Sequence, residues 1–222
     1  MLFRLSLGLA ISAPFLGAAP VPCITDTLAN YAAPGFSCTA GTLLYDTFNF
    51  SVLSSSNPAI AITAAQITVT PGSLRLLFSS PSFQVTGADF ETFQFGFRVD
   101  PPPFKDITGT LSVGGKTNGQ GNTNINVGGV TGNQATFAFS LIANPASSVL
   151  TNAATFALTD KVVILNRIVL QANGGTAGFN SVEEVFGGPA FIPTPEPGAG
   201  ILCAAGLIGL FTLRRRFSSL LT

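Results

Sequence analysis

Two stretches of the chain alternate apolar and polar side chains with a period of two residues. Their apolar positions are Phe93, Phe95, Phe97 and Val99 within residues 92–99, and Ala135, Phe137, Phe139 and Leu141 within residues 134–142. Successive side chains of a strand point to opposite faces of a sheet. This period therefore predicts two strands that each bury one face.

Less regular apolar runs predict six further strands, and turn residues separate them. The runs are residues 46–52, 66–70, 74–78, 107–113, 162–170 and 177–185, and the turn signals include Pro71-Gly72, Pro101-Pro102-Pro103, Asn144-Pro145 and Asn173-Gly174-Gly175. Proline, glycine and asparagine in such clusters favour turns. About eight short strands without helical periodicity predict an all-β fold, an antiparallel β-sandwich that we expect to be of the jelly-roll type.

Residues 114–133 interrupt this pattern with a run that is rich in glycine and asparagine. Such a composition predicts either a long exposed loop or a hairpin with a flexible tip.

Residues 1–19 have the three parts of a secretory signal peptide. Arg4 provides a positive charge, residues 5–13 are apolar, and Gly17-Ala18-Ala19 provides the small residues of a cleavage zone. We expect cleavage after Ala18, because Pro20 disfavours cutting after Ala19. The chain is therefore predicted to leave the cytoplasm through the Sec translocon.

The opposite end contains an uncharged apolar segment, residues 198–213, between Pro195-Glu196-Pro197 and the cluster Arg214, Arg215 and Arg216. As a helix this segment would be about 24 Å long, which suits a single transmembrane helix in a locally thinned bilayer. The arginines are predicted to hold the far end in the cytoplasm, by the positive-inside rule. The domain between the two ends would then lie outside the cytoplasm.

In this order, the tripeptide, the apolar segment and the arginine cluster resemble the PEP-CTERM sorting signal of Gram-negative, biofilm-forming bacteria. The resemblance covers only about residues 193–217. It implies that an exosortase, a membrane-embedded cysteine protease, recognises Pro195, Glu196 and Pro197 and cuts near them. The same tail is also called an ice-binding protein C-terminal domain, a name that implies nothing about ice. An ordinary tail anchor is the alternative.

These features divide the chain into four parts: a signal peptide (1–19), a β-sandwich ectodomain (20–186), a linker (187–194) and a sorting tail (195–217) with its transmembrane helix at 198–213. The ectodomain has two cysteines, Cys23 and Cys38. Export places them in an oxidising compartment, so we predict a disulfide between them.

The charge content limits the partners of the ectodomain. Charged residues make up 9% of the chain, against about 25% in a typical soluble domain. Residues 20–194 contain six basic and nine acidic residues, hence a formal charge of −3. A basic stripe for nucleic acid is absent. The neutral polar surface fits contact with polysaccharide or with other surface proteins better.

The residue inventory excludes most catalytic sites. The chain has no histidine, which rules out Ser-His-Asp and Cys-His catalytic arrangements and histidine-based zinc sites. Glu183 and Glu184 are adjacent, so on a strand they would point to opposite faces. Asp100 and Asp106 flank a proline-rich loop and would suit a glycosidase pair if they converged, but aspartates that cap turns explain them more simply. We predict no catalytic residue, no metal and no cofactor.

The leading hypothesis is therefore a non-enzymatic structural or adhesive protein. It would be anchored transiently in the inner membrane, processed by an exosortase, and then associated with the cell surface or with an extracellular matrix containing exopolysaccharide. A lectin-like carbohydrate-binding module is the alternative. A glycoside-type hydrolase that uses Asp100 and Asp106 is a distant third.

Overall fold

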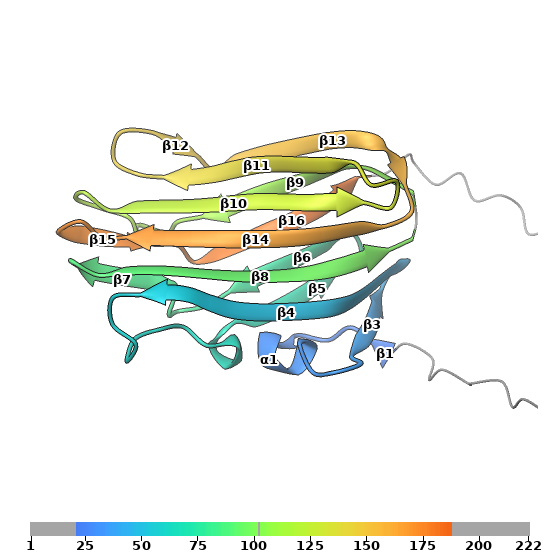
Figure 1. The fold of residues 1–222 in the computed structure, drawn as a ribbon, viewed down its shortest axis with the longest axis horizontal. Coiled ribbons are helices and arrows are strands. Elements are labelled where there is room, and N and C mark those ends of the chain that lie inside the picture. The colour runs from blue at the N-terminus through green and yellow to red at the C-terminus, as the bar shows by residue number, and fades with distance from the viewer. Residues whose placement is uncertain (1–20, 102, 188–222) are drawn as a thin grey trace, which may run out of the picture. The chain divides into compact units, whose positions relative to one another are not determined.

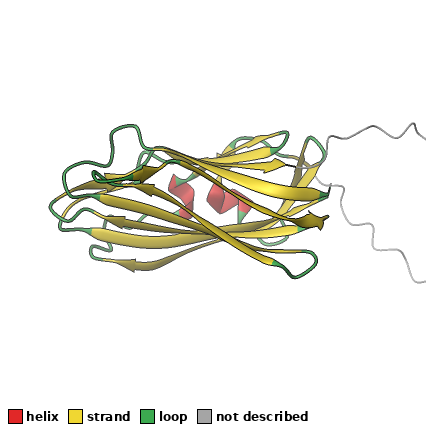
Figure 2. Cartoon of the chain, turned by 90° about the horizontal axis from the view of Figure 1, so that it is seen from above, coloured by secondary structure: helices red, strands yellow, loops and turns green. Residues whose placement is uncertain are grey.

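The computed structural model describes residues 21–101 and 103–187, and most of these residues form strands in two sheets (Figure 1). The predicted antiparallel β-sandwich is confirmed, and Figure 2 shows its two layers of strands. The signal helix and the transmembrane helix predicted at 1–19 and 198–213 lie outside the described residues. Within the described ranges, no helix has the length and apolar character needed to span a bilayer.

The larger sheet has eight strands and faces the viewer in Figure 1. In spatial order they are β1 (Val21–Pro22), β3 (Ser37–Ala40), β4 (Leu43–Ser55), β8 (Phe90–Asp100), β14 (Val162–Gln171), β10 (Asn122–Thr131), β11 (Thr136–Ala143) and β12 (Ser148–Val149). Neighbours pair antiparallel, apart from the short parallel pair β1–β3.

The smaller sheet has six strands and lies behind the larger one in Figure 1. In spatial order they are β13 (Thr151–Thr159), β9 (Phe104–Ser112), β16 (Ser181–Gly187), β6 (Arg75–Ser79), β5 (Thr68–Gly72) and β2 (Asp26–Thr27). A two-stranded sheet, β7 (Gln84–Gly87) with β15 (Gly175–Gly178), and two helical turns, α1 (Leu28–Tyr31) and η1 (Ala64–Gln66), complete the described fold.

The chain crosses repeatedly between the two sheets. Strands β6, β9, β13 and β16 belong to the smaller sheet, whereas β8, β10, β11 and β14 belong to the larger one. The spatial orders β6-β16-β9-β13 and β8-β14-β10-β11 place strands that are distant in sequence side by side. Any surface that spans the larger sheet is therefore assembled from segments far apart in the chain.

The core between the sheets is built mainly from phenylalanine. The predicted inward set Phe93, Phe95, Phe97 and Val99 of β8 is fully buried. Phe78 of β6 meets Phe95 across the sandwich with ring centroids 4.4 Å apart. Burial of such a side chain contributes roughly 1.5–3 kcal/mol, so the hydrophobic face of β8 is a main source of stability.

Several polar side chains are also buried in this core, and three of them lie near one another. Tyr45 of β4 and Asn166 of β14 come from the larger sheet, and Glu184 of β16 comes from the smaller one. The Tyr45 hydroxyl, the Asn166 amide and both Glu184 carboxyl oxygens have no hydrogen-bond partner of ordinary geometry among the described residues. Unpaired polar groups in a core are costly, so this cluster opposes the stability that the phenylalanines provide.

The structure departs from the sequence prediction in several segments, among them the short strands β1, β2, β3, β7 and β12, which were not predicted. Residues 177–185, predicted as one strand, are divided between β15 and β16, and β13 was not predicted. Of the two alternatives predicted for residues 114–133, a long exposed loop and a hairpin with a flexible tip, the loop is wrong, because β10 lies there, between β14 and β11. Strands β10 and β11 form an antiparallel hairpin instead. Strand β10 is stable there because its alternate side chains, among them Ile125 and Val127, are fully buried.

Candidate functional site

The predicted disulfide between Cys23 and Cys38 is present, with 4.9 Å between the Cα atoms. It joins the start of the described chain to β3, and the Cys23 amide also donates a hydrogen bond to the Thr39 carbonyl at 2.8 Å. The segment between the cysteines contains α1. The bridge therefore fastens α1 and the loop that follows it at the edge of the larger sheet.

The predicted sorting motif, Pro195, Glu196 and Pro197, lies outside the described residues. The same is true of Arg214, Arg215 and Arg216, which were predicted to orient the tail in the membrane. The described part of the chain ends with β16 at Gly187.

The structure does not bring Asp100 and Asp106 together as a catalytic pair. Asp100 ends β8 in the larger sheet, where a carboxyl oxygen lies 2.8 Å from the Arg98 guanidinium. Burial raises the pKa of Asp100, and the nearby Arg98 opposes this change. Asp106 belongs to β9 in the smaller sheet and is in register with Thr155 and Gly187. Because both side chains alternate with buried core residues, they project from the outer faces of different sheets.

The adjacent glutamates of β16 point to opposite faces, as predicted. Glu183 is partly exposed and forms an ion pair with Arg75 at 2.6 Å. Glu184 is fully buried, and desolvation raises the pKa of its carboxyl to about 8, although the Asn166 amide beside it acts in the opposite direction. The two carboxyl groups cannot share a substrate.

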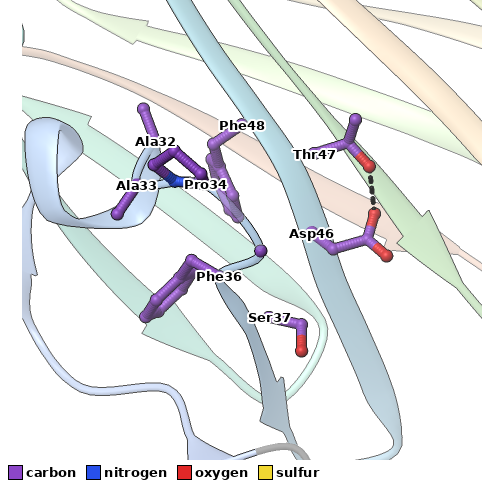
Figure 3. Close-up of a pocket in the computed structure, with 9 residues that line it drawn as sticks. Ala32, Ala33, Pro34, Phe36, Ser37, Asp46, Thr47 and Phe48 are labelled. Atoms are coloured by element: carbon purple, nitrogen blue, oxygen red, sulfur yellow. Dashed lines mark hydrogen bonds between the residues drawn. The ribbon is translucent and has the colours of Figure 1, made fainter. Parts of the chain in front are cut away.

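A hollow of about 490 Å³ lies between β4 and the loop that joins α1 to β3 (Figure 3). Its lining consists of Ala32, Ala33, Pro34, Gly35, Phe36, Ser37, Asp46, Thr47 and Phe48. Figure 3 places Phe36 and Phe48 on the α1 side of β4, and the polar ends of Asp46 and Thr47 on its other side. This edge hollow has the volume of a small-molecule pocket, and its lining combines apolar and polar groups.

A bulge in β4 shapes the polar rim of the edge hollow. The register of β4 against β8 shifts between Asp46 and Asn49. Thr47 lies in the bulge with a φ of 55°, a value that is exceptional for a β-branched residue. Its hydroxyl donates to a carboxyl oxygen of Asp46 at 2.5 Å. The other Asp46 oxygen pairs with Arg98, so Asp46 connects the rim to the outer face of the larger sheet.

That outer face carries a line of polar side chains across five adjacent strands. Cross-strand pairing joins Ser51 of β4, Gln94 of β8, Arg167 of β14, Asn126 of β10 and Ser140 of β11 in direct register. Ser140 donates a hydrogen bond to the Asn126 side chain at 2.8 Å. We call these five residues the polar row. With about 4.8 Å between strands, the row is roughly 19 Å long.

The next line of residues on the same face consists mostly of residues with small side chains or none. Across the sheet it contains Asn49, Gly96, Leu165, Gly128 and Ala138. Leu165 is 41% exposed, and the Asn49 side chain lies beside Gly96. A Cβ added at Gly128 would meet only the Phe137 carbonyl oxygen, at 3.7 Å. The polar row is therefore bordered by a strip with few side chains, in which Leu165 is the main apolar contact.

Sequence reasoning identified the edge hollow and the polar row only in fragments. Gln94 and Ser140 were recognised as polar positions of alternating strands, but Asn126 lay in a segment expected to be a loop or the arm of a hairpin. The missing information was the order of the strands β4-β8-β14-β10-β11 and the register between them. The hollow depends on a bulge and a loop, for which the sequence held no signal beyond Pro34-Gly35.

No model of a known protein family matches the chain, and no curated protein sequence matches it. Its structure resembles TmCBM61 in complex with β-1,4-galactotriose (11% identity, 63% of this chain and 88% of that chain, TM-score 0.33). It also resembles the enzymatically active domain of tailspike protein 4 of bacteriophage CBA120 (13% identity, 64% of this chain and 19% of that chain, TM-score 0.28). A family 11 carbohydrate-binding module from Clostridium thermocellum is similar too (8% identity, 65% of this chain and 85% of that chain, TM-score 0.22). At these TM-scores the likenesses are too weak to indicate what the chain binds.

Proposed function

We propose that the domain is a non-enzymatic carbohydrate-binding module that holds a polysaccharide on the outer face of the larger sheet. The polar row is the observation that carries this proposal. Amide side chains such as Gln94 and Asn126 offer both donors and acceptors, and so do the serine hydroxyls. Sugar hydroxyls need both. A row of these groups across five strands suits a ligand that repeats its hydroxyls along an extended chain.

The strip beside the polar row supports the same ligand. A pyranose ring presents C–H groups on its faces, and Leu165 offers an exposed apolar contact of matching character. Gly128 carries no side chain that would hold a sugar chain away from the row, and the Asn49 amide beside Gly96 offers a further donor and acceptor. The edge hollow is a second contact, where the partly exposed ring of Phe36 faces a cavity whose rim carries Asp46 and Thr47.

Affinity electrophoresis of the full chain in gels containing neutral and acidic polysaccharides tests this function. We expect at least one polysaccharide to retard the protein. Gln94→Ala and Asn126→Ala should each weaken that retardation about two- to tenfold, because each removes one or two hydrogen bonds of about 0.5–1.5 kcal/mol. Thr108→Ala, on the outer face of the smaller sheet, is the matched control. Retardation by none of the polysaccharides, or equal retardation of all variants, would refute the proposal.

The separation of Asp100 and Asp106, the two carboxylates considered as a glycosidase pair, supports a non-enzymatic role. Asp100 is engaged by Arg98, Asp106 lies on the other sheet, and Glu184 is enclosed in the core. Glycoside hydrolysis needs two carboxyl groups on either side of one glycosidic bond. Intact oligosaccharides after prolonged incubation with the protein are the expected result.

We further infer that the sandwich is a jelly roll. In this eight-stranded fold two Greek keys are wound over two sheets. The spatial orders β6-β16-β9-β13 and β8-β14-β10-β11, with chain crossings between the sheets, support that assignment. Strands β4 and β5 then extend the two sheets at one side.

We also propose that the module reaches the cell surface by the route that its termini predict. Sec-dependent export, transient anchoring through residues 198–213 and exosortase cleavage near Pro195-Glu196-Pro197 would deliver it to an exopolysaccharide matrix. Glu196→Ala, or Arg214–Arg216→Ala, should leave uncut protein in the inner membrane in cell fractionation. Normal surface release of both variants would reduce the tail to a plain anchor.

A further inference from the structure

We propose that the polysaccharide is acidic, and that Arg167 binds a carboxylate of its uronic acid residues. This inference rests on the proposed function and specifies its ligand. Arg167 lies on β14 in the middle of the polar row, paired in register with Gln94 on one side and Asn126 on the other. Its side chain is exposed. A carbohydrate lying along the row must therefore pass over its guanidinium group.

Arg167 differs from the other arginines of the described region because no acid pairs with it. Arg75 forms an ion pair with Glu183, and Arg98 forms ion pairs with Asp46 and Asp100. Within the described ranges, Arg167 has no carboxylate within 4.0 Å and donates no side-chain hydrogen bond. Its planar group is therefore free to form two parallel hydrogen bonds with a carboxylate.

The residues around Arg167 leave its charge uncompensated. The diagonal neighbours on β8 and β10 are Thr92, Gly96, Asn124 and Gly128, and none carries a charge. The carboxylates of Asp46 and Asp100 are already paired with Arg98, which lies about 13 Å farther along β8 than Gln94. The centre of this face is therefore locally positive, on a domain whose described residues have a formal charge of −3.

This combination favours a polyuronate over a more highly charged polymer. One arginine in a row of amides and hydroxyls complements a ligand in which each sugar carries one carboxylate beside its hydroxyls. Nucleic acid places a negative charge about every 1.7 Å of its axis and is bound through clusters of basic residues. The described acidic residues outnumber the basic ones, so a polymer of that charge density would be repelled more strongly than a polyuronate, whose charges are more widely spaced.

The test compares pairs of polymers that differ only in their carboxyl groups. Polygalacturonate and polymannuronate, each with its carboxyl-reduced counterpart, are placed in affinity gels with the full chain. At least one polyuronate should bind about tenfold or more tightly than its reduced form, the factor expected for a charge-assisted bidentate contact. Arg167→Gln should abolish this difference, and Arg167→Lys should restore only part of it. Lys105→Gln, which removes an exposed charge from the smaller sheet, should leave it unchanged.

The outcomes separate this inference from the function on which it rests. Equal binding of polyuronate and reduced polymer, or an Arg167→Gln protein that still discriminates between them, would overturn the inference and leave carbohydrate binding intact. Competition by double-stranded DNA at the same charge concentration would also overturn it, because the contact would then recognise charge alone. If neither charged nor neutral polysaccharides bind, both proposals fail. Unchanged melting temperatures of the variants show that folding is not the cause.

Discussion

The buried carboxyl of Glu184 should make the stability of the domain fall as the pH rises. Burial raises its pKa in the folded protein to about 8, against an ordinary value of 4.5. Below pH 4.5 both the folded and the unfolded chain carry the proton. Between pH 4.5 and 8 the unfolded chain releases it and the folded chain retains it. The free energy of unfolding then decreases by about 1.4 kcal/mol per pH unit.

The magnitude follows from the width of this interval. Over 2.5 pH units, from 4.5 to 7, the carboxyl lowers the free energy of unfolding by about 3 kcal/mol, and by pH 8 the total is about 5 kcal/mol. Above pH 8 both states are ionised and no further loss is expected from this group. Glu184→Gln has a similar volume and does not titrate. It should therefore equal the wild type near pH 4 and exceed its stability by about 3 kcal/mol at pH 7.

Urea unfolding at pH 4, 5.5, 7 and 8.5 measures this difference, with the midpoint and the slope determined at each pH. Glu183→Gln is the matched control, because it removes the neighbouring carboxyl, which forms a partly exposed ion pair with Arg75. Its effect should stay within about 1 kcal/mol at every pH. If the wild type and Glu184→Gln show parallel pH profiles, Glu184 is not an isolated buried acid and the reasoning fails.

Two other predictions concern stability. Reduction of the disulfide, or the double variant Cys23→Ser and Cys38→Ser, should lower the free energy of unfolding by about 3 kcal/mol, the chain-entropy value for a loop of fifteen residues. Urea unfolding with and without reductant measures this difference, and an unchanged midpoint would contradict the prediction. Gly128→Ala should stabilise the protein by up to about 1 kcal/mol in thermal unfolding, because its Cβ would make only an ordinary van der Waals contact, with the Phe137 carbonyl oxygen at 3.7 Å. Gly129→Ala should destabilise the protein by about 1–3 kcal/mol, because its Cβ would lie 2.4 Å from the Val163 carbonyl oxygen. If Gly129→Ala were more stable than Gly128→Ala, β10 would not be a central strand.

The sequence predicted the fold where one face of a strand is strongly apolar. Strands β8 and β11 were found from the alternation of apolar and polar residues, and β4, β5, β6, β9 and β14 from their apolar runs. The sequence pattern was insufficient for β13, because its small residues Ala153 and Ala154 give little difference in hydrophobicity between the two faces of the strand. It was equally insufficient for β10, where Gly128 and Gly129 lower the strand propensity. Pairing with β14 and β11 overrides that propensity, and pairing is not a local property.

The asparagines and glycines that made β10 hard to predict from the sequence also give the larger sheet its polar outer face. A typical central strand exposes side chains of strong β-propensity, and its pattern is then easy to recognise. Strand β10 instead exposes Asn122, Asn124 and Asn126 and a glycine, while Ile125 and Val127 hold it in the core. Asparagine and glycine weaken an exposed strand face, so their presence at the centre of a sheet is unfavourable for folding alone. The three asparagines of β10 therefore support the proposal that a polar ligand binds this face. They are the reason to locate the carbohydrate here rather than on the outer face of the smaller sheet.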